Sequence, residues 1–468
     1  TNEEVVNISP ELDQVQKAEV AALLDCNSSV MSAIPGCTNT LEFDIELSTS
    51  EPFKSRFYPV PVHLREHFDQ EVDKLEDLAI IEPSDSPHAS PAVLVAKPDS
   101  SYRLTIDFRD LNALTVTQAE PPCLVEENIH QFAGAKFFSE LDLAKAYHQI
   151  KLTDRAKPLT AFRTRKGLRQ FRRLPFGLVN APAVYAKLMR IVLHGLPNVL
   201  FYFDNVYVYS DTWPEHLVFL KKVLVRLAEH NLTLRPSKCM IGYSAISYLG
   251  FDISYNSLQP CEAKIDAIMN FAVPSSKKML RSFLGLVSFY RKFIPNCASI
   301  SAPLTDMLRN NSRDPLQWSD DLQKCFDTLK QCLVSKPILK IPDVTKTFVL
   351  RTDASQSGLG CVLLQYHDNV AHPVAYASRK LVDRETRYAT IERECLAIVW
   401  GIRKFKYYLY GKKFILEVDH KPLIYLSKFK GDNARLMRWA LILQPYQYQI
   451  VHIPGRDNLG ADLLSRIS

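Results

Sequence analysis

The stretch VLFYFDNVYVYS, residues 199–210, consists of two apolar runs separated by a polar pair, Asp204 and Asn205. Val, Tyr and Phe are common in strands, and Asp and Asn tolerate the backbone angles of a two-residue hairpin loop. The stretch therefore predicts a β-hairpin with its turn at this pair. The same pair could also hold a metal ion, but on this stretch alone a turn without further function is the simpler interpretation.

The chain as a whole has the composition of a globular protein with more than one domain. Its 468 residues are 47% hydrophobic and 23% charged, which is too long for one core and indicates about two to four domains. The formal charge of +6 weakly favours a polyanionic partner. Ten cysteines without a C-x-x-C pair favour reduced thiols, and no apolar run is long enough to span a membrane. A first residue other than Met favours a processed piece of a longer precursor.

Patterns along the chain predict four segments. Residues 1–50 form a lead-in whose helix, SPELDQVQKAEVAALLD, is expected to be capped by Ser9. Residues 51–255 mix helical periods with β-branched runs without βαβ regularity, which favours an α+β fold. Residues 256–340 are mostly helical, and residues 341–468 mix strands and helices up to a last helix near Asn458.

A second acidic position lies upstream of the hairpin. In KFFSELDLAKAYHQIKL, residues 136–152, a strand-like run ends on Asp142. Two strand-end carboxylates that face each other can hold the divalent ions used in nucleotidyl transfer. Aspartates at strand ends are more often solvated or capping groups, so the residues alone leave both interpretations open.

Six stretches resemble, in order and spacing, the polymerase motifs of reverse transcriptases from gypsy-type LTR retrotransposons. They are YRLTIDFRDLN, SELDLAKAYHQI, RRLPFGLVNAPAVY, YFDN, LRPSKC and YLGFDIS. Further stretches resemble the ribonuclease H (RNase H) domain of the same family, namely TDASQSGLGCVLL, TIERECLAIVWGIRKF, VDHKPL and IPGRDNLGADLLSR. The resemblance implies a right-hand polymerase with fingers and palm in residues 51–255 and a thumb in 256–340, followed by an RNase H-like mixed-sheet α/β domain in 341–468.

The resemblance also assigns expected roles in the polymerase. Asp142 and Asp204 match the metal-binding palm carboxylates, and Tyr147 resembles the aromatic gate that excludes a nucleotide 2′-hydroxyl. Arg103 matches the arginine that contacts the triphosphate, since its fork of donors suits phosphate oxygens. The weaker substrate-binding candidates are Lys97, Lys238, Phe176, Gly177, Leu249 and Gly250.

In the RNase H region the resemblance assigns four carboxylates as catalytic metal ligands. These are Asp353, Glu394, Asp419 and Asp462, expected on a strand, a helix, a strand and a helix. Glu392 is the competing candidate for the position assigned to Glu394. Glu394 is preferred because the match runs through ECLAI. Four such side chains can hold two metal ions that activate water and stabilise the leaving oxygen.

The hairpin departs from the family pattern, which reads Tyr-x-Asp-Asp where this chain reads Tyr-Phe-Asp-Asn. Asn205 removes one negative charge, which predicts a severely weakened polymerase. The alternative is an enzyme in which only the RNase H works, while an inactive polymerase serves as a nucleic-acid-binding scaffold. The basic stretch RTRKGLRQFRRL, residues 163–174, is either a solvated hairpin face or a contact to template phosphates.

The resemblance implies Mg²⁺ at both centres, with Mn²⁺ as the alternative ion. The implied partners are RNA or DNA templates with a primer, RNA/DNA hybrids and deoxynucleoside triphosphates (dNTPs), without a membrane. The resemblance leaves open whether the protein forms a homodimer. The family also implies an intracellular location, in a cytoplasmic virus-like particle.

Overall fold

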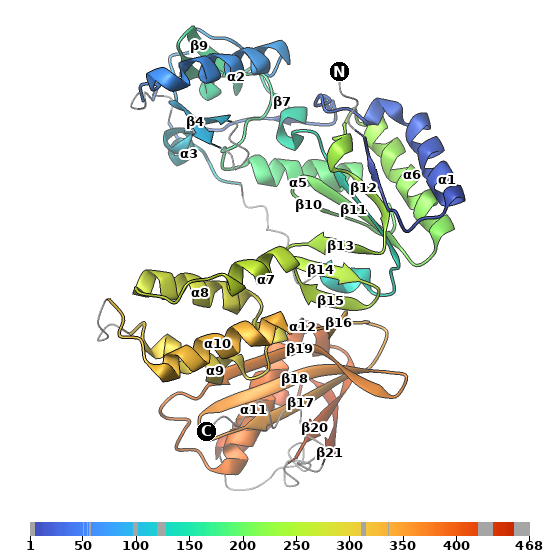
Figure 1. Ribbon diagram of the computed structural model, residues 1–468, viewed down its shortest axis with the longest axis vertical. Coiled ribbons are helices and arrows are strands. Elements are labelled where there is room, and N and C mark those ends of the chain that lie inside the picture. Colours follow the sequence, from blue (N-terminus) through green and yellow to red (C-terminus); the bar gives the residue numbers. More distant parts are fainter. Residues whose placement is uncertain are drawn as a thin grey trace. The chain divides into compact units, whose positions relative to one another are not determined.

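The computed structural model describes residues 5–49, 51–53, 55, 58–96, 102–118, 128–309, 315–335, 337–419 and 434–453. The chain divides into two compact units (Figure 1). The first comprises Thr1–Asn128 and Gly134–Ile246, and the second comprises Ile129–Ala133 and Ser247–Ser468. The expected division into four segments stays a prediction, although the lead-in contributes a strand to the first unit.

A five-stranded sheet forms the centre of the first unit. Its strand order is β1 (Asn7–Ile8), β12 (Met240–Tyr243), β6 (Phe137–Asp142), β11 (Asn205–Ser210) and β10 (Val199–Tyr202). Strand β6 is antiparallel to both β12 and β11, whereas β1 pairs in parallel with β12. Five of the six residues of β11 are buried, as the Val- and Tyr-rich sequence of a central strand predicts.

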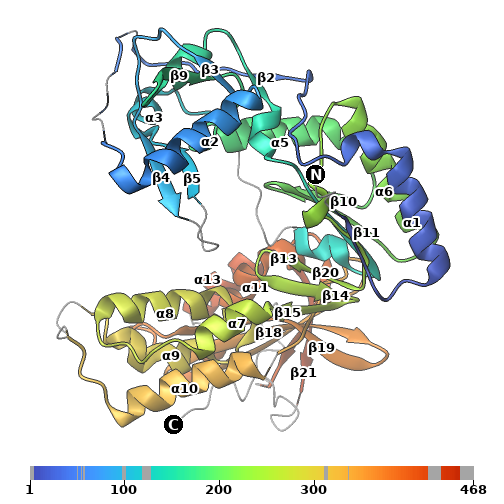
Figure 2. The same ribbon diagram turned by 45° about the horizontal axis from the view of Figure 1, so that its top comes forward.

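Helices α1 (Gln14–Cys26), α5 (Ala181–Val192) and α6 (Trp213–Glu229) accompany this sheet. The apolar faces of α5 and α6 share one hydrophobic core with β6 and β11, including Leu188, Leu224 and Val208. Figure 2 shows α1 alongside α6, and the Trp213 indole donates to Glu19 across this contact at 2.8 Å.

The rest of the first unit consists of short elements between residues 42 and 171. The strands pair as β2–β7, β4–β5 and β3–β9–β8. Their bounds, with those of the two helices, are β2 Glu42–Phe43, α2 Arg65–Asp77, β3 Ile81–Pro83, β4 Ala92–Ala96, β5 Tyr102–Ile106, α3 Arg109–Leu114, β7 Lys151–Leu152, β8 Phe162–Thr164 and β9 Gly167–Phe171.

The second unit begins with a small antiparallel sheet and a group of helices. The sheet has the order β13 (Ala245–Tyr248), β14 (Phe251–Ser254), β15 (Ser257–Pro260) and β16 (Leu339–Lys340). The helices are α7 (Glu262–Met269), α8 (Lys277–Phe289), α9 (Cys297–Asp306) and α10 (Asp320–Val334). Phe283 of α8 and Phe326 of α10 are buried against each other, with ring centroids 4.5 Å apart.

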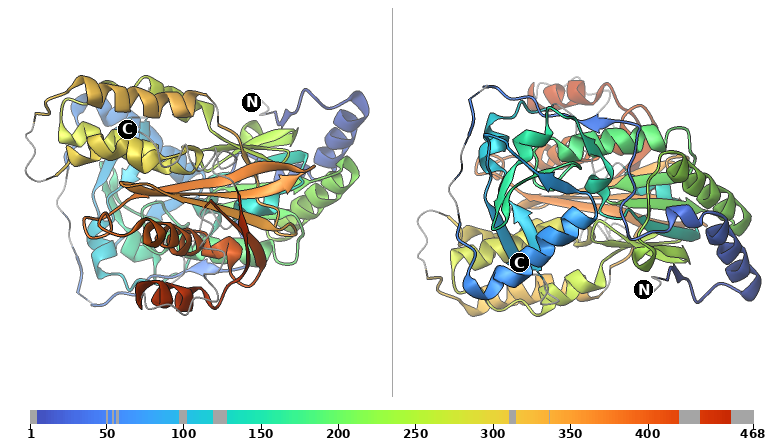
Figure 3. Two further views of the ribbon diagram at one scale, coloured as in Figure 1. Left: turned by 90° about the horizontal axis from the view of Figure 1, so that it is seen from below. Right: turned by 90° about the horizontal axis from the view of Figure 1, so that it is seen from above.

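A five-stranded mixed sheet forms the rest of the second unit. Its order is β19 (Val370–Lys380), β18 (Gly358–His367), β17 (Phe348–Ala354), β20 (Lys413–Val418) and β21 (Gln447–His452). Strands β17 to β19 are antiparallel, and β20 is parallel to both β17 and β21. Helices α11 (Thr390–Lys404), α12 (Lys406–Leu409) and α13 (Ala434–Leu443) complete it; Figure 3 shows α9 and α11 on opposite sides of the sheet.

Two local expectations were wrong. Helix α1 begins at Gln14 with Asp13 as its cap, because Asp13 and Gln16 bond each other's backbone N–H groups, whereas the Ser9 N–H donates to Ile241 O beside β1. The hairpin turn consists of Phe203 and Asp204, because Asn205 already pairs with Tyr202. The last helix expected near Asn458 lies outside the described residues.

Within the described part of the chain, no helix is both long and apolar enough to cross a bilayer. The nine described cysteines are free thiols.

Candidate active sites

Asp142 and Asp204 come together at the ends of neighbouring strands. Asp142 is the last residue of β6 and pairs with Asn205, the first residue of β11, so Asp204 in the turn lies directly beside it. Both carboxylates line a cleft of ≈ 580 Å³, which Arg103, His148, Phe176 and Lys238 also line. The antiparallel pairing of β6 and β11 therefore brings two acids distant in sequence into one cleft.

The electrostatics of this cleft suit a cation. Burial raises the pKa of Asp142 and of Asp204, and the charge of Asp142 raises the pKa of Asp204 further. Lys238 opposes these shifts, with its Nζ 3.6 Å from Asp142 Oδ2, and the charge of Arg103 lowers the pKa of Asp204. Half-buried carboxylates that repel each other are stabilised by a divalent ion, so this donor set fits Mg²⁺.

Tyr147 belongs to a buried aromatic group near Asp204. The residue is 8% exposed, and its ring packs 5.0 Å from the ring of Phe176 and 5.5 Å from that of Tyr185. Burial and the charge of Asp204 raise the pKa of Tyr147 to about 12, which keeps its hydroxyl protonated. Gly177, next to Phe176, has φ +95°, a backbone conformation that disfavours any residue other than glycine there.

The other expected substrate contacts divide between the units. Arg103 on β5 is exposed to the cleft, and Lys97 lies outside the described residues. Leu249 and Gly250 belong to the second unit, where they form the β13–β14 turn with φ values of 55° and 84°. The Gly250 carbonyl accepts a hydrogen bond from the Tyr290 hydroxyl at 2.7 Å, which fixes this turn on the adjoining helix end.

The basic stretch at 163–174 is less available than its sequence suggests. Four of its six cations form ion pairs with acids of α2 and β3. These pairs are Arg165–Asp69, Lys166–Asp73, Arg169–Glu76 and Arg172–Glu82. The acids reduce the net positive charge that the stretch can offer to phosphates.

Sequence reasoning missed Glu140. The Asn205 amide donates to Glu140 Oε1 at 2.7 Å, so this carboxylate contacts the altered position of the hairpin. Burial and the charge of Asp142 raise the pKa of Glu140 to about 7. Its spacing of two residues from Asp142 places both side chains on one face of β6, and this periodicity was a signal in the sequence.

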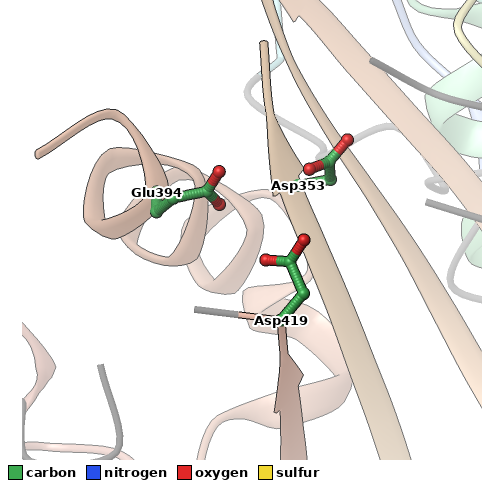
Figure 4. A group of neighbouring side chains, drawn as sticks. All are labelled: Asp353, Glu394 and Asp419. Atoms are coloured by element: carbon green, nitrogen blue, oxygen red, sulfur yellow. The ribbon is translucent and has the colours of Figure 1, made fainter. Parts of the chain in front are cut away.

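A second acidic cluster lies in the C-terminal sheet. Asp353 is the penultimate residue of β17, Asp419 follows β20, and Glu394 lies on α11; Figure 4 shows the three side chains pointing toward one another. One carboxylate oxygen of each lies within 4.8 Å of the others. The parallel pairing of β17 with β20 places the two aspartates side by side. Asp462 lies outside the described residues.

The cluster is acidic and largely buried. Burial and the charges of Asp353 and Asp419 raise the pKa of Glu394 to about 9. Glu392 points elsewhere, because it accepts from the Ala389 N–H at 3.0 Å and from Arg435 at 2.9 Å. Three oxygen donors at this spacing fit a divalent cation, which would relieve their repulsion.

Two family models match the chain. "Reverse transcriptase (RNA-dependent DNA polymerase)" matches residues 95–253, and "RNase H-like domain found in reverse transcriptase" matches residues 343–446. Both acidic sites lie within these matches.

Curated relatives resemble almost the whole chain. The retrovirus-related Pol polyprotein from transposon 297 of Drosophila melanogaster is 37% identical over 92% of this chain and 41% of its own length. The transposon Tf2-7 polyprotein of Schizosaccharomyces pombe is 32% identical over 98% of this chain and 35% of its own length. The chain thus spans less than half the length of these polyproteins.

Solved structures show the same fold. A foamy viral protease-reverse transcriptase in complex with double-stranded DNA has a TM-score of 0.87 at 22% identity, over 95% of this chain and 79% of the other. The same type of protein in complex with an RNA/DNA hybrid has a TM-score of 0.79 at 22% identity, over 98% and 62%. The expected fold class, an α+β right-hand polymerase followed by an RNase H-like domain, is confirmed.

Proposed function

Because the chain belongs to the reverse transcriptases with an RNase H-like domain that gypsy-type retrotransposon Pol polyproteins carry, we propose that it synthesises DNA on RNA and DNA templates and degrades the RNA of RNA/DNA hybrids. The observation that carries this proposal is the presence of two separate carboxylate sites, at Asp142 and Asp204 and at Asp353, Glu394 and Asp419. Each lies in the part of the chain whose family performs the corresponding chemistry.

In the polymerase site, Asp142 and Asp204 would hold Mg²⁺, with Mn²⁺ as the alternative. The bound ions would neutralise the triphosphate and stabilise the oxygens that attack and leave. Arg103, exposed in the cleft, would bind triphosphate oxygens, and Lys238 beside Asp142 would add positive charge. Tyr147 would restrict the space under the sugar and so select dNTPs.

Asn205 weakens this site in the proposal. A neutral amide in place of the second carboxylate leaves less negative charge to balance two divalent ions. Loss of a group that supports a metal ligand typically costs about 10- to 100-fold in affinity or activity. We therefore expect DNA synthesis that is slow relative to hybrid cleavage.

In the RNase H site, Asp353, Glu394 and Asp419 would hold the metal ions, with Asp462 as a fourth ligand predicted from the sequence. Bound metal would activate water and stabilise the leaving oxygen of the RNA strand. The three described carboxylates are already gathered within 4.8 Å, so binding would require little rearrangement. The site should act on the hybrid by its backbone and 2′-hydroxyls rather than by base sequence.

A second candidate is an enzyme in which only the RNase H works, while the polymerase serves as a nucleic-acid-binding scaffold. Asn205 is the observation that favours it. In either case the proposed partners are a primed template or an RNA/DNA hybrid. An active polymerase also uses dNTPs. A homodimer and a location in a cytoplasmic virus-like particle also belong to the proposal, on the strength of the family alone.

Two assays on the same protein separate these candidates. Extension of a labelled primer on RNA and DNA templates, and cleavage of labelled RNA in a hybrid, are measured with Mg²⁺ and with EDTA. Slow extension together with hybrid cleavage supports the first candidate, and cleavage without extension supports the second. A folded protein that does neither in Mg²⁺ or Mn²⁺ contradicts both.

A further inference from the structure

Glu140 and Asn205 are joined by a direct contact next to the palm carboxylates. In the antiparallel pairing of β6 with β11, Asn205 is opposite Asp142 and Tyr207 is opposite Glu140. Side chains of paired and of alternate residues share one face of a sheet. Glu140, Asp142 and Asn205 therefore lie on the same face, and the 2.7 Å bond from Asn205 Nδ2 to Glu140 Oε1 runs diagonally across the two strands.

This bond fixes the orientation of the Asn205 amide. The amide nitrogen is the donor and Glu140 Oε1 the acceptor, so the amide oxygen of Asn205 faces away from Glu140. Asn205 Oδ1 is buried and has no hydrogen-bond partner among the described residues. A buried carbonyl oxygen is unfavourable without a donor or a cation, so this atom is oriented to accept one.

We propose that Glu140 and Asn205 act as one unit, in which Glu140 supplies the negative charge missing at position 205 and holds Asn205 Oδ1 as a neutral ligand beside Asp142. Glu140 is then a positioning residue of the polymerase. This inference rests on the proposed polymerase function and revises one part of it. Glu140 offsets the loss of charge at position 205, so the weakening expected from Asn205 alone is reduced, and the altered hairpin is a rearranged site rather than a defective one.

The Glu140–Asn205 pair predicts what happens when Asn205 is replaced by the aspartate of the family pattern. Asn205→Asp alone places a second carboxylate at hydrogen-bond distance from Glu140, where two acceptors of like charge repel each other. Combined with Glu140→Gln, the same substitution reverses the hydrogen bond, because the glutamine amide donates and the new aspartate accepts. The double variant keeps both the bond and the total charge of the natural pair.

The test compares four proteins: the natural chain, Glu140→Gln, Asn205→Asp and the double variant. Asn198→Asp, at the open end of the same hairpin, and Glu11→Gln, in the lead-in, are matched controls at exposed positions. The first readout is the rate of primer extension and the Mg²⁺ concentration that gives half of it. The second is the rise in melting temperature on adding Mg²⁺; the RNase H cluster is identical in all proteins, so differences between them arise in the palm.

Each single variant is expected to extend primers about 10-fold more slowly, or to need about 10-fold more Mg²⁺, as for loss of a metal-supporting group. The double variant is expected to recover at least the natural rate and the natural Mg²⁺-induced rise. The proposal is overturned if, in both readouts, the effect of the double variant equals the sum of the effects of the two single variants. Residues that act together show non-additive effects. If none of the proteins extends a primer, the polymerase function fails, and the Mg²⁺-induced rise still decides the pairing.

Discussion

Replacing Asp419 by Asn should stabilise the protein without metal while removing its RNase H activity. The Asp353, Glu394 and Asp419 oxygens lie within 4.8 Å of one another, held there by two strands and a helix. Folding therefore brings like charges together, which costs free energy, and the binding of a cation removes this cost. The side chain of Asn has nearly the same shape as that of Asp; it removes the charge and replaces one acceptor oxygen by an amide donor.

The size of the effect follows from the spacing. The pKa of Glu394 at about 9 makes this group protonated at neutral pH without metal, so the repulsion is chiefly between Asp353 and Asp419. Two charges within 4.8 Å of each other, at an effective dielectric constant near 20, repel by about 3 kcal/mol, and partial exposure of Asp419 reduces this to about 1–3 kcal/mol. For a unit of this size, that corresponds to a rise of about 2–10 °C in melting temperature.

Calorimetry in EDTA and in Mg²⁺, with cleavage of a labelled hybrid, measures both effects. Asp419→Asn should melt higher than the natural chain in EDTA, gain less from Mg²⁺ and cleave no RNA. Asp383→Asn is the matched control, because Asp383 is exposed in the same unit, away from the cluster. If the variant melts at or below the temperature of the natural chain in EDTA, Asp419 does not repel its neighbours in the folded protein; if it still cleaves the hybrid, Asp419 is not needed at the RNase H site.

Three further predictions concern the first unit and the helices of the second. Tyr147→Val should raise the incorporation of ribonucleotides relative to that of dNTPs, whereas Tyr147→Phe should not, since only the former removes the ring. If Tyr147→Val selects dNTPs in primer extension as strongly as the natural chain does, Tyr147 is not the gate. His216, buried between Ser139 and Ser210, has a pKa lowered to about 4 by burial, so the unfolded chain takes up a proton near pH 6.5 while the folded chain stays neutral. Stability should therefore fall by roughly 3 kcal/mol between pH 6.5 and 4, and urea unfolding of His216→Gln should show a shallower fall; an unchanged pH dependence would exclude this group. Phe283→Ala should destabilise the second unit by about 3–5 kcal/mol in denaturant unfolding, because the ring is fully buried, and a loss below about 1 kcal/mol would show that the site collapses around the cavity.

Local patterns in the sequence were sufficient for much of the fold. The strand-like run before Asp142 predicted a strand ending there, and β6 ends at that residue. The match through ECLAI favoured Glu394 over Glu392, and the structure has Glu394 in the acidic cluster. These features depend on residues close together in the chain, where periodicity and motif spacing carry the information.

Features that depend on distant partners were missed. Ser9 looked like a helix cap, but its N–H pairs with Ile241, more than two hundred residues away, so Asp13 caps the helix instead. The turn of the hairpin was placed one residue late because Asp204 and Asn205 both suit a turn, whereas pairing with Asp142 holds Asn205 in β11.

The same limit applies to the polar contacts of the site. The Glu140–Asn205 bond joins residues 65 positions apart, and four of the six cations of the basic stretch form ion pairs with acids about 90 positions upstream. The sequence names such residues but not their pairing, which only the folded sheet determines.

On the function proposed above, one chain holds two independent carboxylate sites with separate chemistry. Primer extension and hybrid cleavage, measured side by side for Asp204→Asn and Asp419→Asn, show whether the two sites work independently. We predict that the first variant loses extension and keeps cleavage, and that the second loses cleavage and keeps extension. Loss of both activities in either folded variant, or of neither, would contradict the account.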